Sequence, residues 1–330
     1  MKFQFDPLPK SFVLAKPIQW GEYDENEIYE LEKNGRLIIE VKRDGWKLLD
    51  INANKQIKIY TDGPREITNR IPHIAEELRS RKLPNNTFLV SEGLIVANGK
   101  DERGKIQSVL HKDTSIEKSL LAQRIFKMRQ MVFEIVFWDG QYLLDKPYAE
   151  RLTLIQKFLD RDGYICPPEI LNMPVDEAKK FVLKHNLEGL VLYDTEFRSS
   201  FRLDGDNPKR PDGCYKWKPM YEGDFIVRDL IPSKERPGDF KEILLLQIDP
   251  KTGKEIDCGK HGVFSKKDRK EIQALFRKNK PFVVQFEYET RTENNKLTNK
   301  RFVGIRHDKK WQDCVIPSKI FPKNMKGVSQ

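Results

Sequence analysis

The sequence predicts an α+β domain with a mixed or antiparallel sheet, followed by a smaller domain built mainly of strands. The chain has 330 residues, which is enough for two domains. Helix-like and strand-like segments alternate up to about residue 220, and the segments after it are nearly all strand-like. Residues 203–213 are rich in Gly, Pro, Asp and charge, which is typical of a loop. We therefore expect domains at 1–220 and 221–330.

In the first domain, apolar periodicity and turn residues set the expected elements. Pro147 is expected to open a helix, because proline suits the first helical turn. The expected helices cover residues 21–35, 69–82, 147–160 and 176–185. The expected strands cover residues 87–97, 130–138 and 187–194.

The segment 38–50, IIEVKRDGWKLLD, reads as two strand-like runs interrupted by Asp44-Gly45. An Asp-Gly pair is a strong signal for a hairpin turn. Glycine supplies the backbone freedom of such a turn, and Asp44 builds it. Lys42 then lies at the end of a half-buried strand, where a plain solvated lysine is the alternative to a functional one.

The second domain contains several short strand-like segments and one helix near residues 266–278. The strands are expected at 224–231, 241–249, 281–291 and 300–306. This pattern is compatible with a five-stranded barrel of the oligonucleotide-binding type, the OB-fold.

Composition limits the class of protein. Hydrophobic residues make up 38% and charged residues 33% of the chain, as in a charge-rich globular protein. No apolar run approaches the roughly 20 residues of a membrane span, and the N-terminus lacks a signal-peptide core. We expect an intracellular protein that is not secreted and has no membrane partner. The four cysteines are widely separated, so neither a zinc site nor a disulfide framework is expected.

The positive charge is concentrated in the second domain. Residues 221–330 contain 24 Lys and Arg against 16 Asp and Glu, a balance of +8, whereas the net charge of the whole chain is +10. A basic module beside a nearly neutral one indicates a polyanion partner, although a solubilising surface is the alternative.

Charged side chains interrupt several of the expected strands, where burial would cost them their hydration. The segments concerned are Lys42, Glu92, Phe133-Glu134, Glu188, Lys216 with Lys218, and Arg306 to Lys309. Bound nucleotide and a divalent metal would supply partners for such charged groups. Glu134 is the weakest candidate for a functional residue, because we expect it at a solvent-facing edge.

In this order, the segments resemble the covalent nucleotidyltransferases: ATP-dependent DNA ligases, RNA ligases and mRNA capping enzymes. EVKRDG (40–45) resembles the nucleotidyl-lysine motif, and FLVSEG, VFEIVFWDG and LEGLVL resemble the motifs that follow it. YKWK (215–218) resembles the fifth motif, and RFVGIRHDK (301–309) resembles the sixth in its DNA ligase form. LAKP, DKPYAERL and GVFSKKDRKEI also look ligase-like, so the resemblance runs from about Leu14 to Trp311.

The resemblance implies an adenylation domain followed by an OB-fold, with ATP as the AMP donor and Mg²⁺ or Mn²⁺ as the metal. Lys42 would attack the α-phosphate of ATP, and the AMP would then pass to the 5′-phosphate of a nick. Glu92 would bind the ribose and help to hold the metal, for which Glu188 is the best candidate ligand. Phe133 would stack on adenine, unless it is a plain core residue. Glu40 would contact adenine or hold Lys42.

Cations complete the implied site. Lys216 and Lys218 are expected on one strand face, where their charge would help keep the Lys42 amine unprotonated. Arg306 and Lys309 would bind the β- and γ-phosphates, which requires the second domain to close over the first. Lys47 stands where DNA ligases usually have an arginine, and Tyr60-Thr61 stand where another is expected, with Arg65 as a possible substitute.

The leading hypothesis is a minimal ATP-dependent DNA ligase that acts as a monomer on nicked double-stranded DNA. An mRNA capping guanylyltransferase with a lysyl-GMP intermediate is the alternative, since KWKP is rather capping-like. A third hypothesis is a nucleic-acid-binding barrel fused to an inactive domain. An NAD-dependent ligase is not expected, because that type adds an N-terminal domain and clustered zinc cysteines.

Overall fold

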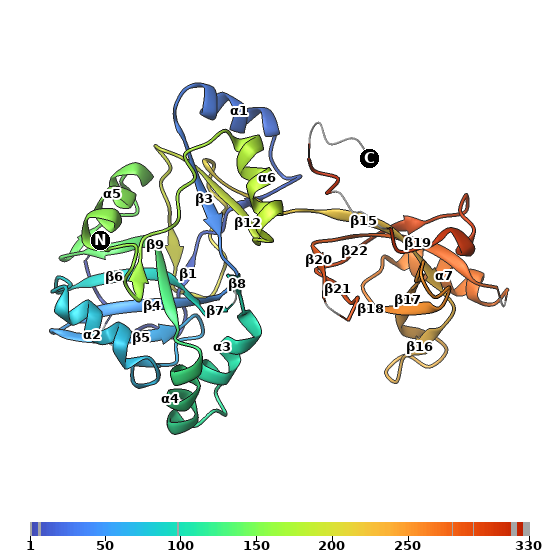
Figure 1. Cartoon of the computed structure of the whole chain (residues 1–330), viewed down its shortest axis with the longest axis horizontal. Helices are drawn as coiled ribbons and strands as arrows, with labels where there is room; N and C mark the ends of the chain where they lie inside the picture. The colour runs from blue at the N-terminus through green and yellow to red at the C-terminus, as the bar shows by residue number, and fades with distance from the viewer. Residues whose placement is uncertain are drawn as a thin grey trace. The chain divides into compact units, whose positions relative to one another are not determined.

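The structure, a computed structural model, describes residues 2–5, 8–97, 99–278, 280–292, 294–317 and 322–325. The chain forms two compact units, Met1–Trp217 and Lys218–Gln330 (Figure 1). Each unit is a mixture of strands and helices with its own buried apolar core. The α+β class predicted for the first part of the chain is confirmed. Among the described residues, no helix has the length and apolar character needed to cross a bilayer.

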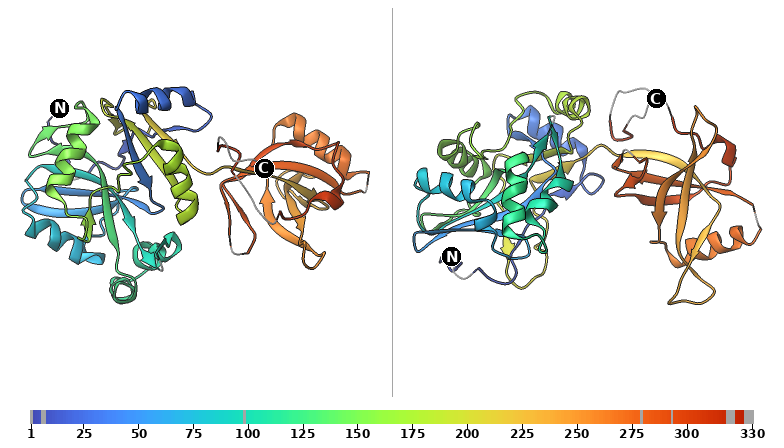
Figure 2. Two further views of the ribbon diagram at one scale, coloured as in Figure 1. Left: turned by 45° about the horizontal axis from the view of Figure 1, so that its top comes forward. Right: turned by 60° about the horizontal axis from the view of Figure 1, so that its bottom comes forward.

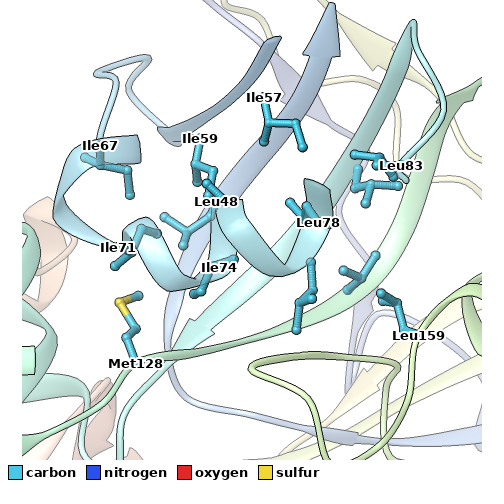
Figure 3. Close-up of a cluster of buried hydrophobic side chains, with 14 of the residues drawn as sticks. Leu48, Ile57, Ile59, Ile67, Ile71, Ile74, Leu78, Leu83, Met128 and Leu159 are labelled. Atoms are coloured by element: carbon cyan, nitrogen blue, oxygen red, sulfur yellow. The ribbon is translucent and has the colours of Figure 1, made fainter. Parts of the chain in front are cut away.

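The larger sheet of the first unit has six strands and carries most of its core. Its strand order is β10-β9-β6-β4-β5, with β11 parallel to β9. These strands are β4 (Trp46–Ala53), β5 (Gln56–Thr61), β6 (Thr87–Leu94), β9 (Arg129–Trp138), β10 (Gln141–Tyr142) and β11 (Ile165–Cys166). One face of the sheet packs against α2 (Pro72–Ser80) in a cluster that includes Leu48, Ile59, Ile74 and Leu78 (Figure 3).

The second sheet of this unit has four strands in the order β2-β14-β12-β3. They are β2 (Ile18–Gln19), β3 (Leu37–Lys42), β12 (Gly189–Asp194) and β14 (Cys214–Trp217). Helices α1 (Glu25–Lys33) and α6 (Val175–His185) pack on it, and α5 (Tyr148–Phe158) packs on β9 of the larger sheet. Two short pairs complete the strands of the unit: β1 (Val13–Leu14) with β13 (Phe201–Arg202), and β7 (Val96–Ala97) with β8 (Lys100–Asp101).

The predicted hairpin turn at Asp44-Gly45 is wrong. β3 and β4 follow each other in the chain but belong to different sheets, so residues 43–45 form a crossing between sheets. Glycine is required there for another reason. A Cβ on Gly45 would lie 2.3 Å from the carbonyl oxygen of Gly93, so the crossing touches the backbone of β6.

Helix boundaries follow local chemistry. The segment expected as one helix from 69 to 82 is a 3₁₀ turn, Thr68–Arg70, followed by α2, which starts at Pro72 because proline suits a first helical position. Helix α1 starts after Asp24, whose Oδ1 accepts a hydrogen bond from the Asn26 amide at 3.0 Å. Helix α6 ends at Asn186, which adopts the left-handed conformation with φ of 53°.

Two helices that the sequence analysis did not predict lie together at one edge of the first unit (Figures 1 and 2). They are α3 (Arg103–Leu110) and α4 (Ile116–Ile125). α4 is inverted, because its buried positions are the polar residues Ser119 and Gln123. Ser119 hydrogen-bonds to the Val109 carbonyl, and Gln123 accepts from the Met128 amide at 2.8 Å. The leucines and isoleucines of α4 are exposed, with Leu121 57% and Ile125 71% exposed.

The second unit is a strand-rich domain in which five strands follow the path β18-β17-β15-β19-β22, with β16 also beside β17. In the chain, helix α7 (Lys266–Phe276) lies between β18 and β19, the third and fourth of these five strands in sequence order, as in an OB-fold. The strands are β15 (Tyr221–Val227), β16 (Leu230–Pro232), β17 (Phe240–Ile248), β18 (Glu255–His261), β19 (Phe282–Tyr288) and β22 (Arg301–Ile305). A hairpin, β20 (Thr290–Arg291) with β21 (Leu297–Thr298), and a 3₁₀ turn, Trp311–Asp313, complete it.

Candidate nucleotide-binding site

Two adjoining hollows in the first unit share Lys42 and Glu92 in their walls. The smaller one has a volume of about 200 Å³ and is lined by residues of both sheets, including Glu40, Phe133 and Lys216. The larger one, about 480 Å³, is an open cleft with a mainly polar lining. Its lining includes Asp44, Lys47, Asp62, Arg65, Arg103 and Glu188. The structure thus brings together every residue of the first unit that the sequence analysis selected.

Lys42 is the last residue of β3, and sheet pairing places its partner. Lys42 lies opposite Gly189 in the β3–β12 register, which brings the preceding residue, Glu188, beside the lysine. The Lys42 Nζ lies 2.6 Å from Glu188 Oε2, and the two side chains are 26% and 16% exposed. The expectation of cations around this amine is therefore incomplete, because its closest charged partner is a carboxylate.

Glu92 occupies the middle of the larger sheet, opposite Lys47 on β4 and Met131 on β9. The pKa of Glu92 is raised to about 7, mainly by burial and in smaller part by the nearby Glu188 charge. Lys42 and the hydrogen bond from the Gly45 amide act in the opposite direction. Glu92 is therefore a carboxyl group that gains from any further cation or hydrogen-bond donor brought into the hollow.

Glu40 lines the smaller hollow. It is 2% exposed, and it accepts a hydrogen bond from the Tyr148 hydroxyl. Burial raises the pKa of Glu40 to about 8, although the Tyr148 hydrogen bond lowers it. Strand register places Glu40, Val191 and Lys216 side by side on β3, β12 and β14. Glu40 and Lys216 therefore face the same hollow from two strands apart.

Phe133 and Glu134, consecutive residues of β9, both line the smaller hollow, because a register shift against β6 between Val132 and Glu134 interrupts the alternation of side chains. Phe133 is partly buried, lines the smaller hollow and packs against the aromatic core around Phe137. The expectation that Glu134 faces solvent at an edge is wrong. Glu134 is 3% exposed, and its two oxygens accept hydrogen bonds from Arg151 Nε at 2.6 Å and Nη2 at 2.9 Å.

The open cleft is lined by two cations that were noted from the sequence, Lys47 and Arg65, and by one that was not, Arg103. Lys47 Nζ pairs with Asp62 Oδ1 at 2.5 Å. Arg65, which the sequence left as a possible substitute for a missing arginine, lines the cleft, and its guanidinium donates to the Leu110 carbonyl. Arg103, at the start of α3, was not predicted at all. Its Nη1 lies 3.0 Å from Asp44 Oδ1, and its side chain is 61% exposed.

Lys218, Arg306 and Lys309 belong to the second unit. β14 ends at Trp217, so Lys218 lies beyond the strand that was expected to align it with Lys216, and it pairs with Glu289 at 2.8 Å. Arg306 Nη1 lies 3.0 Å and Lys309 Nζ 3.4 Å from the carboxylate of Asp224. A bound phosphate would have to compete with these carboxylates.

The donor set around Lys42 matches what magnesium prefers. Glu92 and Glu188 offer hard carboxylate oxygens. Burial raises the pKa of Glu92, and the like charge of Glu188 adds to that effect, so a bound cation would favour the charged form of Glu92. In the part of the chain that the structure describes, no cluster of three or more His, Cys, Asp or Glu side chains forms a metal cage. This arrangement fits magnesium, which is usually held by one or two carboxylates together with substrate phosphates.

Comparison with known proteins decides the family. A family model described as an ATP-dependent DNA ligase domain matches residues 14–218. The chain belongs to this family. The DNA ligase 1 of Methanosarcina mazei is 26% identical over 268 residues, which cover 74% of this chain and 45% of that protein. The DNA ligase of Nanoarchaeum equitans is 24% identical over 269 residues, which cover 76% of this chain and 45% of that protein. This ligase-family chain thus spans about half the length of the curated relatives it matches.

Solved structures support the fold of this ligase-family chain. One is described as "DNA binding with a minimal scaffold: Structure-function analysis of Lig E DNA ligases". It is 17% identical, has a TM-score of 0.61, and the match covers 89% of this chain and 99% of that chain. The expected architecture, an adenylation domain followed by an OB-fold, is confirmed. The family assignment favours the ligase over the capping-enzyme alternative.

Proposed function

We propose that this protein is an ATP-dependent DNA ligase that seals nicks in duplex DNA through a lysyl-AMP intermediate on Lys42. One observation carries the proposal. Lys42 lies in the common wall of a small hollow with an aromatic side chain and an open, polar cleft, 2.6 Å from a carboxylate. A nucleoside suits the first space and a polyphosphate the second, so the amine would lie at the α-phosphate between them.

In the first step, the Lys42 nitrogen forms a bond to the α-phosphorus of ATP, and the bond to the bridging oxygen breaks. Pyrophosphate takes the electron pair, and the amine loses a proton. The ion pair with Glu188 orients the amine before attack, and it has to loosen so that the nitrogen lone pair becomes available. Lys47, Arg65 and Arg103 line the cleft where charge accumulates on the leaving group.

Within the nucleoside hollow, Phe133 would stack on adenine, and Glu92 would accept hydrogen bonds from the ribose hydroxyls. Glu40 would contact adenine, with its orientation fixed by Tyr148. Glu188, with Glu92, would hold Mg²⁺ or Mn²⁺. The metal would supply charge neutralisation at the phosphates.

In the next two steps, AMP passes from Lys42 to the 5′-phosphate of the nick, and the 3′-hydroxyl then displaces it to close the phosphodiester bond. The basic second unit would bind the DNA backbone. We also propose that Lys216 and Lys218 stabilise the transferring phosphoryl group. Arg306 and Lys309 would bind the β- and γ-phosphates in the first step. We expect the protein to act as a monomer.

The test is covalent labelling followed by nick sealing. The protein is incubated with magnesium and with ATP or GTP radiolabelled at the α-phosphate, and the adduct is mapped by mass spectrometry. We expect AMP, and not GMP, on Lys42, and sealing of a nicked duplex with ATP. Lys42→Ala should abolish the adduct, whereas Lys33→Ala, at an exposed lysine of α1, should leave it unchanged.

An adduct that persists in the Lys42→Ala variant would refute the nucleophile. Preferential transfer of GMP would instead support the capping enzyme. A chain that binds nicked DNA but forms no adduct with either nucleotide would support the hypothesis of an inactive domain fused to a barrel.

A further inference from the structure

The three residues after Lys42 carry the chain from one sheet to the other, so no hairpin pairing holds them. These residues are held instead by the segment 101–103, at the end of β8 and the start of α3. Asp101 forms an ion pair with Arg43, and Arg103 forms one with Asp44.

The first ion pair is the more extensive. Arg43 Nε donates to Asp101 Oδ2 at 2.9 Å, and Arg43 Nη2 donates to Oδ1 at 2.6 Å. The same carboxylate accepts from the backbone amide of Asp44 at 3.1 Å. The two side chains are 18% and 9% exposed, so this pair is partly shielded from water. A bidentate, shielded Arg–Asp pair fixes both direction and distance.

The second ion pair joins Asp44 to Arg103 at 3.0 Å, at the edge of the open cleft. Asp101 and Arg103 therefore grip two consecutive residues directly after Lys42. The other flank of Lys42 is held by the pairing of β3 with β12. On its second edge β3 bonds to residues 169–171 through Ile39 and Val41, and Arg43 also lies 3.5 Å from Glu169. Asp101 adds to these contacts by holding both the Arg43 side chain and the amide of Asp44.

We propose that Asp101, acting through Arg43 and the amide of Asp44, is a positioning residue for the Lys42 amine. This inference rests on the proposed function, because it assigns Asp101 to the formation of the lysyl adduct. Asp101 does not line either hollow, so it acts through the loop and not by contact with the nucleotide. A loosened loop would let the amine drift from the line of attack, and a misplacement of about 1 Å can cost about 100-fold in rate.

The chain offers a matched control at the opposite end of the same strand. Arg36, just before β3, donates to Asp194 from Nε at 3.2 Å and from Nη2 at 2.6 Å. Asp194 also accepts from a backbone amide, that of Glu196, at 3.0 Å. Asp194→Asn therefore removes the same kind of contact from β3 as Asp101→Asn, but six residues away from Lys42.

The experiment measures single-turnover adenylation over a range of ATP concentrations, and sealing of a nick that is already adenylated. The second reaction does not use Lys42 as a nucleophile. For Asp101→Asn we expect the maximal adenylation rate to fall about 10- to 100-fold. We expect half-saturation by ATP and sealing of the pre-adenylated nick to change by less than about threefold. Asp194→Asn should leave all three quantities near those of the unaltered protein.

Rescue provides a second variant in case Asp101→Asn disturbs folding. The exchanged pair Arg43→Asp with Asp101→Arg restores an ion pair and should recover more adenylation than Arg43→Asp alone. An unchanged adenylation rate in Asp101→Asn, or equal losses in adenylation and in sealing of the pre-adenylated nick, would overturn the inference. If the unaltered protein forms no adduct, the proposed function fails first, and this inference fails with it.

Discussion

At the scale of single residues, the unusual feature is the number of buried carboxyl groups in the first unit. Asp50 is fully buried in the larger sheet and accepts hydrogen bonds from Ser91 Oγ at 2.9 Å and Gln130 Nε2 at 3.1 Å. The three residues come from neighbouring strands, β4, β6 and β9. Burial raises the pKa of Asp50 to about 7, although both hydrogen bonds lower it.

The pKa of Asp50 predicts a pH dependence of stability. The ordinary value is 3.8, so between about pH 4 and pH 7 the unfolded chain has lost a proton that the folded chain keeps. The stabilising contribution is complete below pH 4 and disappears as the pH rises through 7. In Asp50→Asn this dependence is absent. Chemical denaturation should therefore show that, as the pH rises through this window, the free energy of unfolding of the variant increases relative to that of the unaltered protein by up to about 1.4 kcal/mol per pH unit.

Comparing the variant with the unaltered protein at each pH cancels the titration of Glu40 and Glu92, which also have raised pKa values. A difference in unfolding free energy that stays constant from pH 4.5 to 7.5 would contradict the assignment to Asp50.

At the scale of elements, the crossing from β3 to β4 brings two backbones into contact. Gly45 lies so close to β6 that a Cβ would meet the Gly93 oxygen at 2.3 Å and the Glu92 Cγ at 2.8 Å. Neither partner can move without disturbing β6 or the carboxylate of the site. The glycine therefore keeps the two sheets close enough to share Lys42 and Glu92.

Gly45→Ala should lower the free energy of unfolding by about 1–3 kcal/mol, as overpacking does, and it should slow adenylation because Glu92 is displaced. Gly104→Ala is the matched control. Gly104 lies in α3 with no atom within 4 Å of its would-be Cβ, so alanine should stabilise the helix by about 0.5–1 kcal/mol. Thermal unfolding and labelling with ATP measure both effects. Equal behaviour of the two variants would contradict the role of close contact.

Elements with regular patterns were predictable, and those with inverted or interrupted patterns were not. α5, α6, β9 and β12 match their predicted segments closely, because apolar periodicity and capping residues agree there. α4 was missed because its polar residues are inside. β18 was missed because Cys258 is its only buried residue, which leaves no alternation to detect.

The residues of the candidate site also divide into those that local sequence made predictable and those that it did not. Charged residues inside apolar strands, such as Glu92 and Lys42, stood out because burial makes them costly. Asp101 and Arg103 lie in a polar stretch where charge is ordinary, so no signal distinguishes them. The direction of Glu134 depended on Arg151, a partner 17 residues away on α5, and pairing of that kind is not written in local sequence.

At the scale of the whole molecule, the charge division predicts strong salt dependence of DNA binding. The excess of +8 lies in residues 221–330, and Lys266, Lys267 and Lys270 of α7 are exposed. Each lysine that neutralises a phosphate adds about 0.9 to the steepness with which log affinity falls against log salt.

Replacing these three lysines together by glutamine should make that plot shallower by up to about 2.7 and weaken binding at low salt. Fluorescence anisotropy with a nicked duplex at several salt concentrations measures the slope. Lys33→Gln, at an exposed position of α1, is the control and should leave the slope unchanged. An unaltered slope in the triple variant would place the DNA contacts on another surface.

The inverted helix α4 has a practical consequence for work with this protein. The isoleucines and leucines of α4 expose apolar surface on the folded chain. An environment-sensitive dye such as anilinonaphthalene sulfonate should therefore fluoresce before any heating. Replacing Leu121 and Ile125 by lysine should remove much of this initial signal and leave the melting temperature nearly unchanged. Intrinsic tryptophan emission, which does not depend on that surface, is the better reporter for the stability measurements above.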